Sequence, residues 1–266
     1  MNIVVCAKYV PDAQADRGFE EADLTTDRVG VDGRLSELDE YAVEEALKIV
    51  EAGEGQVTVL TMGPAGAADA VKKSLQMGAH AGVHVCDDAI AGSDAAATSL
   101  VLARAIEKIG QDAPVDLVLT GMASTDAVMS VVPAMLAERL GLPQVTYASE
   151  LTVDAAGRTV QARRDGDAET LVVTATLPAL VSVTDQINEP RYPSFKGIMA
   201  AKKKPVQTWT LADLGVDPAS VGLDAAWTRV AATTPRPPKA AGTQVTDDSG
   251  SGSSALVDFL VAGRYV

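Results

Sequence analysis

The sequence predicts an α/β fold built on an open, mostly parallel, Rossmann-like sheet, with an antiparallel extension and an extended C-terminal arm. Three observations lead to this prediction. Residues 1–147 alternate short apolar runs with helical patterns, the runs lack polar alternation, and strand patterns separated by turns replace them from about residue 148. Strands that alternate with helices over short connections form βαβ units, in which helices cover both faces of a parallel sheet.

Four strand–helix pairs are expected in residues 1–147. In chain order they are strand 2–7 and helix 36–53, strand 56–63 and helix 65–79, strand 82–87 and helix 94–110, and strand 115–121 and helix 126–141. Helix 36–53 opens with Ser36 and has Asp39 three residues later, which is the spacing of an N-terminal cap. We expect the four strands to be parallel, so that their carboxyl ends lie at one edge of the sheet.

The segment 149–183 is expected to be the antiparallel extension. Its strand patterns are separated by turns at Ala156-Gly157 and Asp165-Gly166, and it ends in a long apolar strand. Strands joined by such tight turns pair antiparallel.

The C-terminal part is expected to be an arm. The Pro-rich stretch 233–242 cannot form a regular helix and predicts an extended chain. Residues 247–254 predict a flexible joint before a terminal helix at 255–263. We therefore expect an α/β domain with its extension in residues 1–205, and a C-terminal arm with its helix in residues 206–266.

The composition is that of a soluble globular protein with an acidic surface. The 266 residues carry a formal net charge of −14, and the pI of about 4.5 argues against broad binding to nucleic acid or anionic membranes. Cys6 and Cys86 form no CxxC pair, and we interpret both as buried thiols. His80 and His84 lack the partners of a metal site. With no signal-peptide pattern and no run of membrane-spanning length, we expect a cytoplasmic protein.

Several common catalytic motifs are missing from the sequence. No GxGxxG follows a strand and opens a helix, and no GxxxxGK[ST] occurs, which argues against a standard NAD site and a P-loop kinase. No Ser, His and acid set supports a hydrolase. These three kinds of chemistry are therefore poorly supported.

The junction "LTGMASTDAVMSVVPAM" (119–135) is a candidate nucleotide site. Gly121 lets the backbone approach a ligand, and Asp126 can accept a hydrogen bond from a ribose hydroxyl or simply cap a helix. The N–H groups that follow suit a phosphate. The loops at Cys6–Ala7, Ser36–Asp39 and Met62–Pro64 are expected at the same edge of the sheet, which favours an adenine-nucleotide site over a merely capped helix.

The segment "INEPRYPSFKGIMAAKKKP" (187–205) is a candidate docking segment. Pro190 and Pro193 restrict the backbone, which lowers the entropy lost on binding a partner. Phe195 is expected near the tip as an apolar anchor, although an ordinary turn with Phe195 in the core is the alternative. The lysines at 202–204 suit either a solvated face or the steering of an acidic partner.

These motifs together resemble the electron transfer flavoprotein beta-subunit family, in its ordinary AMP-containing bacterial form. The resemblance covers nearly the whole chain and is carried by the following stretches: "VVCAKYVPD" (4–12), "EYAVEEAL" (40–47), "GPAGAADAVKKSLQMGA" (63–79), "VDLVLTG" (115–121), "DGDAETLVVTATLPALVSV" (165–183) and "NEPRYPSFKGIMAAKKK" (188–204). It implies an adenine-nucleotide-hydrolase-like variant of the predicted fold. It also implies a heterodimer with a larger alpha subunit, which holds most of a shared FAD and is contacted by the C-terminal arm.

The resemblance implies an electron carrier without catalytic residues of its own. Such heterodimers take electrons from flavin dehydrogenases, such as the acyl-CoA dehydrogenases of fatty acid oxidation, and pass them to a membrane quinone oxidoreductase. The segment 187–204 corresponds to the family's recognition loop, with Phe195 at its tip. The docking residues that this implies are Arg191, Tyr192, Phe195, Lys196, Lys202, Lys203 and Lys204.

The resemblance also implies a structural AMP in this subunit. The residues that match its contacts are Cys6, Ala7, Ser36, Glu37, Leu38, Asp39, Met62, Gly121, Met122, Ala123, Ser124, Thr125, Asp126, Ala127, Val128, Met129, Ser130, Val131 and Val132. Several of these, among them Val128, Met129 and Val132, stand where small or polar residues are usual in the family, which leaves the backbone N–H groups to hold the phosphate.

Two alternatives remain open at this point. In electron-bifurcating relatives a second FAD occupies the place of AMP. A stand-alone adenine-nucleotide-binding regulator of similar fold would form a homo-oligomer without flavin, and would have no use for the arm and terminal helix of residues 206–266.

Overall fold

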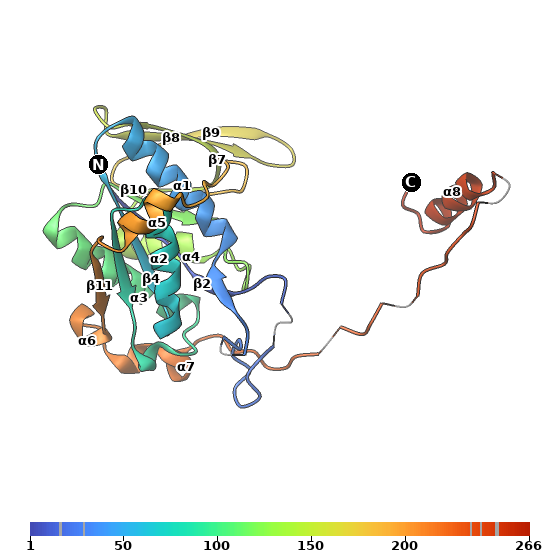
Figure 1. The fold of residues 1–266 in the computed structure, drawn as a ribbon, viewed down its shortest axis with the longest axis horizontal. Coiled ribbons are helices and arrows are strands. Elements are labelled where there is room, and N and C mark those ends of the chain that lie inside the picture. The colour runs from blue at the N-terminus through green and yellow to red at the C-terminus, as the bar shows by residue number, and fades with distance from the viewer. Residues whose placement is uncertain (16–17, 29, 235, 240, 248–249) are drawn as a thin grey trace. The chain divides into compact units, whose positions relative to one another are not determined.

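A computed structural model shows two units, which span Met1–Ala231 and Ala232–Val266 (Figure 1). It describes residues 1–15, 18–28, 30–234, 236–239, 241–247 and 250–266. Among these residues, no helix has the length and apolar character that crossing a lipid bilayer requires.

The first unit is built on a nine-stranded sheet. Its strand order is β11-β5-β4-β1-β6-β10-β7-β8-β9. The strands are β1 (Asn2–Cys6), β4 (Gln56–Met62), β5 (Ala81–Val85), β6 (Leu117–Gly121), β7 (Gln144–Asp154), β8 (Thr159–Asp165), β9 (Thr170–Thr176), β10 (Ala179–Val183) and β11 (Val206–Trp209). All neighbours from β11 to β7 pair in parallel, whereas β7, β8 and β9 pair antiparallel. A separate antiparallel pair joins β2 (Tyr9–Pro11) to β3 (Gly33–Leu35). The predicted α/β fold is confirmed.

Helices cover both faces of this sheet. On one face α1 (Glu37–Ala52) and α2 (Ala68–Met77) share a core with Ile3 and Val5 of β1. On the other face α3 (Ala95–Asp112) and α4 (Val132–Leu140) share a second core with Val4. Successive residues of a strand point to opposite faces, so an apolar run is what a strand buried on both sides requires.

The shorter helical elements lie in the segments that follow β4, β5, β10 and β11 in the chain. They are η1 (Ala65–Ala67), η2 (Asp88–Ile90), α5 (Phe195–Ala201), α6 (Leu211–Leu214), η3 (Pro218–Ser220) and α7 (Gly222–Ala225). Of these, α5 forms part of the segment 187–205 that the sequence marks as a docking segment.

One expected helix begins later than its pattern suggests. The helix expected at 126–141 starts at Val132, and residues 122–131 form a loop. The physical reason lies in two residues: Val128 and Ser130 have φ values of 52° and 57°, which a right-handed helix cannot contain. Pro133 then occupies the first helical turn, where its missing N–H costs nothing.

Two expectations about the later chain also change. The long apolar strand at the end of the segment 149–183 is β10, which lies between β6 and β7 and is parallel to both. The first unit continues to Ala231 because β11 pairs with β5, so residues 206–231, expected in the arm, belong to this unit.

The second unit contains the terminal helix. Residues of 232–251 that the structure describes form no helix or strand, and α8 runs over Gly252–Ala262. Part of the expected joint, residues 248–249, lies outside the described residues, and α8 begins inside the expected joint. Large apolar side chains of α8, for example Leu256 and Phe259, are exposed to solvent.

Candidate functional site

The residues expected at a nucleotide site meet at the carboxyl edge of the sheet. Cys6 ends β1, Met62 ends β4 and Gly121 ends β6, and these three strands are neighbours in the order β4-β1-β6. Asp39, in the first turn of α1, contacts Gly121 at the end of β6 and Lys8, two residues after the end of β1. Parallel strands thus place at one edge the four loops that the sequence predicted there.

Asp39 binds the strand ends to the helix instead of capping it. Its carboxylate accepts hydrogen bonds from the backbone N–H groups of Lys8 (2.8 Å) and Gly121 (3.2 Å). Ser36 occupies the N-cap position without a side-chain capping bond, and its buried Oγ has no hydrogen-bond partner in the described part of the chain. The expected cap is therefore not formed: the Asp39 carboxylate accepts from Lys8 and Gly121, and the Ser36 N–H donates to the Lys8 carbonyl oxygen.

Gly121 makes this approach possible. A Cβ at that position would lie 2.6 Å from Oδ1 of Asp39 and 2.7 Å from the carbonyl oxygen of Leu38. The glycine is thus required for close packing of α1 on β6. The sequence suggested that the backbone at Gly121 approaches a ligand, whereas in the structure it approaches α1.

Asp126 is held by two cations that the sequence analysis did not select. Lys8 Nζ and Arg28 Nη2 each lie 2.9 Å from one of its carboxylate oxygens, and the Asp126 side chain is only 2% exposed. Lys8 also donates to Ser124 Oγ at 3.4 Å. The position of Lys8 just after β1 was a usable signal for this role, whereas Arg28 lies in a loop without a motif.

Burial and charge set the protonation states at this edge. Burial raises the pKa of Asp39 to about 7 against the downward pull of its two N–H donors. Burial also acts to raise the pKa of Asp126, but Lys8, Ser124 and Arg28 outweigh it and hold this pKa below its ordinary value. Burial and the Asp39 carboxylate raise the pKa of Cys6 to about 12, so its sulfur stays a neutral thiol rather than a nucleophile.

The loop that follows β6 presents its middle to solvent. Val128 is 66% exposed and has a positive φ, and Met129, 52% exposed, lies between it and Ser130, which also has a positive φ. A β-branched residue with positive φ is uncommon, and such backbones gather at functional sites. Three others of the expected residues lie at the ends of this loop: Met122 follows β6, Val131 is the last residue before α4, and Val132 begins α4.

These residues fit an anionic nucleotide. Lys8 and Arg28 bring two positive charges against the one negative charge of Asp126, which leaves a local excess of positive charge in an acidic chain. Asp39 adds at most a partial negative charge near neutral pH, because burial raises its pKa. A phosphate near Lys8 and Arg28 would therefore meet a favourable field and the backbone N–H groups of the loop.

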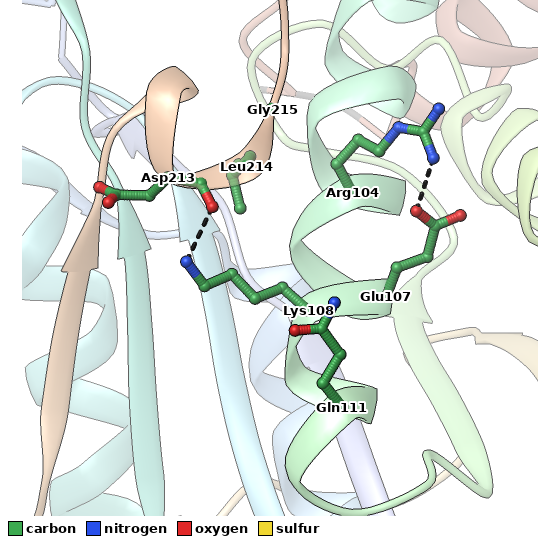
Figure 2. Close-up of a pocket in the computed structure, with 7 residues that line it drawn as sticks. All are labelled: Arg104, Glu107, Lys108, Gln111, Asp213, Leu214 and Gly215. Carbon is green, nitrogen blue, oxygen red and sulfur yellow. Dashed lines mark hydrogen bonds and ion pairs between the residues drawn. The ribbon is translucent and has the colours of Figure 1, made fainter.

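Two hollows of the surface lie elsewhere. One, of about 340 Å³, lies between α3 and α6 and is lined by residues that include Arg104, Lys108 and Asp213 (Figure 2). The other, of about 160 Å³, is lined mainly by apolar residues of α3, β6 and the end of α4. None of the residues expected at the nucleotide or docking sites lines either hollow.

The docking segment exposes a group of apolar side chains. Tyr192 is 92% exposed and Phe195 80% exposed, and Ile198 and Met199 of α5 are exposed as well. We call these four residues the docking patch. The alternative that placed Phe195 in the core is wrong, because Phe195 is the first residue of α5 and points away from the packed side. Lys196, Lys202 and Lys203 are exposed around the patch.

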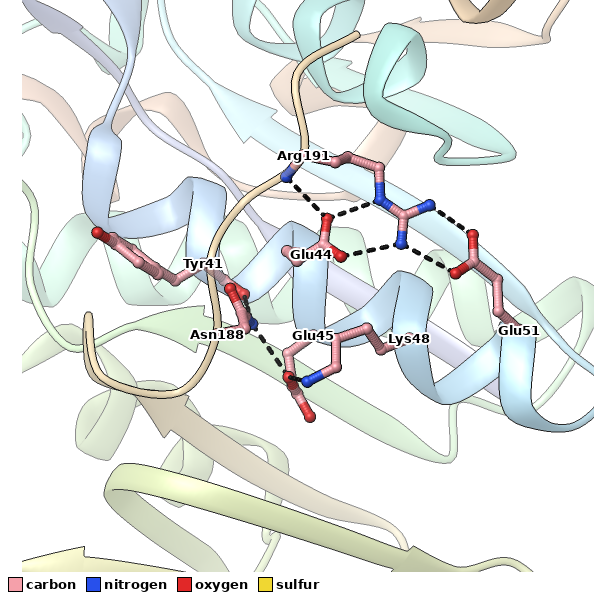
Figure 3. A network of polar contacts seen from close by, with 7 residues as sticks. All are labelled: Tyr41, Glu44, Glu45, Lys48, Glu51, Asn188 and Arg191. Atoms are coloured by element: carbon pink, nitrogen blue, oxygen red, sulfur yellow. Dashed lines mark hydrogen bonds and ion pairs between the residues drawn. The ribbon is translucent and has the colours of Figure 1, made fainter. Parts of the chain in front are cut away.

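Two of the expected docking residues bind other residues of the same chain. Arg191 forms ion pairs with Glu44 and Glu51 of α1 (Figure 3). Lys204 Nζ donates to the carbonyl oxygens of Leu75 and Gly78 at the C-terminal end of α2 (2.9 and 3.0 Å). Both cations hold the segment in place, which the sequence did not indicate.

The cysteines and histidines have local structural roles. Cys6 and Cys86 are free thiols and partly buried, less than expected. His80 Nδ1 accepts a hydrogen bond from the Val57 N–H, and His84 Nε2 lies 3.1 Å from the Gly63 carbonyl oxygen. Within the described ranges, no group of three His, Cys, Asp or Glu residues has an arrangement suited to a metal ion.

Comparisons with known proteins agree with this architecture. A family model described as "Electron transfer flavoprotein domain" matches residues 23–214. The chain is 47% identical over 270 residues to the electron transfer flavoprotein subunit beta of Mycobacterium bovis, covering 100% of this chain and 99% of that protein. Identity to the Mycobacterium leprae protein of that name is 46% over 270 residues, with the same coverage. The caffeyl-CoA reductase-Etf complex subunit CarD of Acetobacterium woodii is 35% identical over 247 residues, 92% of each chain. The chain therefore belongs to the electron transfer flavoprotein beta-subunit family, a family of electron carriers.

Proposed function

We propose that this chain is the nucleotide-holding and partner-docking subunit of a heterodimeric electron carrier in the cytoplasm. The carrier takes electrons from flavin dehydrogenases, such as acyl-CoA dehydrogenases, and delivers them through FAD to a membrane quinone oxidoreductase. The observation that carries this proposal is the 47% identity over the full chain to a protein named electron transfer flavoprotein subunit beta. Two structural features support it: the docking patch, and the group formed by Lys8, Arg28 and Asp126, which we call the charge cluster.

The proposed nucleotide in this subunit is AMP, held at the carboxyl edge of the sheet. Lys8 and Arg28 face Asp126 there, and their excess positive charge favours a phosphate. The backbone of the loop from Gly121 to Val132 would supply N–H donors, which compensate for apolar Val128, Met129 and Val132 at positions where small or polar residues are usual in the family. Asp39 would keep the loop in place by binding the Gly121 N–H.

The alpha subunit is proposed to hold most of the FAD, and this chain to complete the complex. Bound FAD supplies the redox chemistry. The residues of this chain bind, orient and exclude water, and the arm of residues 232–266 would contact the alpha subunit. The exposed apolar side chains of α8, among them Leu256, Val257 and Phe259, are of the kind that an assembled protein normally buries, which supports that role.

The docking patch is proposed to contact the electron-donating dehydrogenases. Redox partners need interfaces that dissociate quickly, and one apolar anchor with charge steering satisfies this need. Phe195 supplies the anchor, and the lysines Lys196, Lys202 and Lys203 supply local positive charge for an acidic partner.

The test is electron transfer from an acyl-CoA dehydrogenase to the heterodimer that carries Phe195→Ala. We expect kcat/KM to fall about tenfold or more, since an exposed aromatic anchor contributes at least about 1.4 kcal/mol to binding. FAD content should not change. The control is Trp227→Ala, which removes an aromatic ring that is 91% exposed elsewhere in the first unit. If Phe195→Ala transfers electrons at the original rate, the docking role of Phe195 is disproved.

A second candidate is a subunit of an electron-bifurcating complex, in which a second FAD takes the place of AMP. The similarity to a protein named as a subunit of a caffeyl-CoA reductase-Etf complex favours it. The two candidates differ in the nucleotide that the same charge cluster would hold.

A further inference from the structure

We propose that Arg191 is a positioning residue. Glu44 and Glu51 of α1 bind its guanidinium and thereby fix the backbone from which Tyr192 and Phe195 project. Arg191 itself would not contact the dehydrogenase. This inference rests on the proposed docking function, because it names the part of the chain that prepares the docking patch for its partner.

All three nitrogens of the Arg191 guanidinium donate hydrogen bonds to the two glutamates. Nε and Nη2 donate to the two oxygens of Glu44 (2.7 and 2.9 Å), and Nη1 and Nη2 donate to the two oxygens of Glu51 (2.5 and 2.9 Å) (Figure 3). The backbone N–H of Arg191 donates to Glu44 as well, at 3.1 Å. Paired parallel hydrogen bonds of this kind fix orientation as well as distance. The backbone of residue 191 is therefore fixed on α1 through both its side chain and its N–H.

The residues of α1 that make these contacts lie along one face of the helix. Tyr41, Glu44, Glu45, Lys48 and Glu51 recur at helical spacing of three and four residues. The carboxylates of Glu44 and Glu45 are only 7% and 6% exposed, and a buried charge is tolerated only when it is paired. This face of α1 thus depends on the docking segment for its own charge balance.

A second contact lies just before Arg191 in the chain. Asn188 Nδ2 donates to the Tyr41 carbonyl oxygen and to a Glu45 oxygen, both at 3.0 Å. Lys48 completes the charge balance of Glu45 at 3.0 Å. Asn188 and Arg191 therefore fix both ends of the short stretch that contains Glu189 and Pro190.

The segment is also fixed beyond the patch. A Cβ on Gly197 would lie 2.6 Å from the Gln76 carbonyl oxygen, so the glycine allows α5 to lie directly against the backbone of α2. Lys204 binds the C-terminal carbonyl oxygens of α2. The docking patch thus projects from a segment that is held at Arg191, Gly197 and Lys204, and a patch that is fixed before binding loses less entropy when it binds.

The decisive comparison is between Arg191→Met and Glu44→Gln in the heterodimer. Glu44→Gln keeps the positive charge of Arg191 and frees it from one partner, so a contact role and a positioning role predict opposite results. A positioning role predicts that both variants raise the KM of an acyl-CoA dehydrogenase for the heterodimer about fivefold, as expected if the competent conformation is populated about one fifth of the time. We expect kcat and FAD content to be unchanged.

The double variant and hydrogen exchange sharpen the test. Because the two side chains act as a unit, the double variant should raise KM no more than either single variant. Backbone amides of residues 192–201 should exchange faster in both variants, a readout that does not depend on electron transfer. The matched control is Arg104→Met, which breaks an exposed ion pair with Glu107 on α3 (2.7 Å) and should change neither KM nor exchange.

Two results would overturn the inference. One is a raised KM for Arg191→Met with an unchanged KM for Glu44→Gln, which would make Arg191 a direct contact. The other is unchanged exchange in residues 192–201 for both variants. If Glu44→Gln does not fold, Glu51→Gln tests the same prediction at the half-exposed partner. A heterodimer that contains FAD but accepts no electrons would refute the proposed function instead, and exchange would still decide the role of Arg191.

Discussion

The carboxylates of Asp39, Glu44 and Glu45 are buried in a chain that is already strongly acidic. Asp39 binds two backbone N–H groups, Glu44 binds Arg191, and Glu45 binds Lys48 and Asn188. A buried carboxylate without such donors would be costly. Each of these acids therefore ties α1 to a distant part of the chain, and their partners determine where the candidate sites lie.

Asp39 should make stability depend on pH. Its ordinary pKa of 3.8 applies to the unfolded chain, and burial raises the folded value to about 7. Between these values the folded chain binds the proton more tightly, so the stability from Asp39 is fully present below about pH 4 and is lost as the pH rises through about 7. We expect the Tm of the heterodimer, relative to that of Asp39→Asn, to fall over this range.

The measurement is thermal unfolding of both proteins at several pH values. The substitution also removes one of the two acceptor oxygens, which shifts Tm by a constant amount and leaves the pH trend to report the carboxyl group. A Tm difference that does not vary between about pH 4 and 7 would show that the pKa of Asp39 is not raised by burial.

Lys204 should contribute to stability rather than to docking. Its ammonium group binds the Leu75 and Gly78 carbonyl oxygens, where the helix dipole of α2 also favours a cation. Lys204→Met should cost about 1 kcal/mol and lower Tm by about 2–4 °C. Lys203→Met is the matched control, since Lys203 is exposed and should leave Tm unchanged. Equal Tm values for the two variants would contradict this assignment.

At the scale of elements, the junction between α1 and the carboxyl ends of β1 and β6 is the packing on which the candidate nucleotide site depends. Asp39 spans this junction, and Gly121 gives it room. The loop that follows β6 then reaches Lys8 and Arg28 through Asp126. The positions of these elements fix the site before any ligand is bound.

Gly121→Ala should therefore disturb two elements together. The added Cβ would lie 2.6 Å from Asp39 Oδ1 and 2.7 Å from the Leu38 carbonyl oxygen, and backbone must move to relieve this contact. We expect a loss of about 1–3 kcal/mol in the free energy of unfolding and less AMP bound to the complex. Gly110→Ala in α3, whose Cβ would meet nothing closer than 3.8 Å, should be neutral or slightly stabilising. Similar losses in both variants would contradict this account of Gly121.

The sequence predicts the central elements well because their signals are local. β1, β4, β5 and β6 are apolar runs between helical patterns. Such a run is enough to predict a strand that is buried on both faces. β11 was missed because its residues Val206, Gln207 and Thr208 are exposed at the edge of the sheet, so no apolar run marks them.

The remaining features depend on long-range pairs. Asp126 has a local pattern typical of a helix start, but Lys8 and Arg28, 118 and 98 residues away, take its carboxylate. Arg191 has the local context of a docking residue, but its partner Glu44 is 147 residues away. A single sequence does not show which residues pair over such distances; of these partners, only Lys8 has a local signal, its position just after β1.

At the scale of the molecule, the distribution of charge and the exposed apolar side chains both indicate surfaces that bind other proteins. The net charge of −14 contrasts with the lysines Lys196, Lys202 and Lys203 near the docking patch. In the second unit, α8 exposes apolar side chains that an assembled protein would bury. The first unit supplies the proposed nucleotide and docking sites, and the second the proposed contact with the alpha subunit.

The central claim is that this chain holds AMP in a heterodimer whose flavin is held mostly by another subunit. The most direct test is to purify the chain with its native partner, denature the complex and quantify the released FAD and AMP by chromatography. We predict one FAD and one AMP per heterodimer. Two FAD and no AMP would contradict the AMP site and identify a bifurcating complex, and a chain without partner or flavin would contradict the claim as a whole, leaving a stand-alone nucleotide-binding regulator.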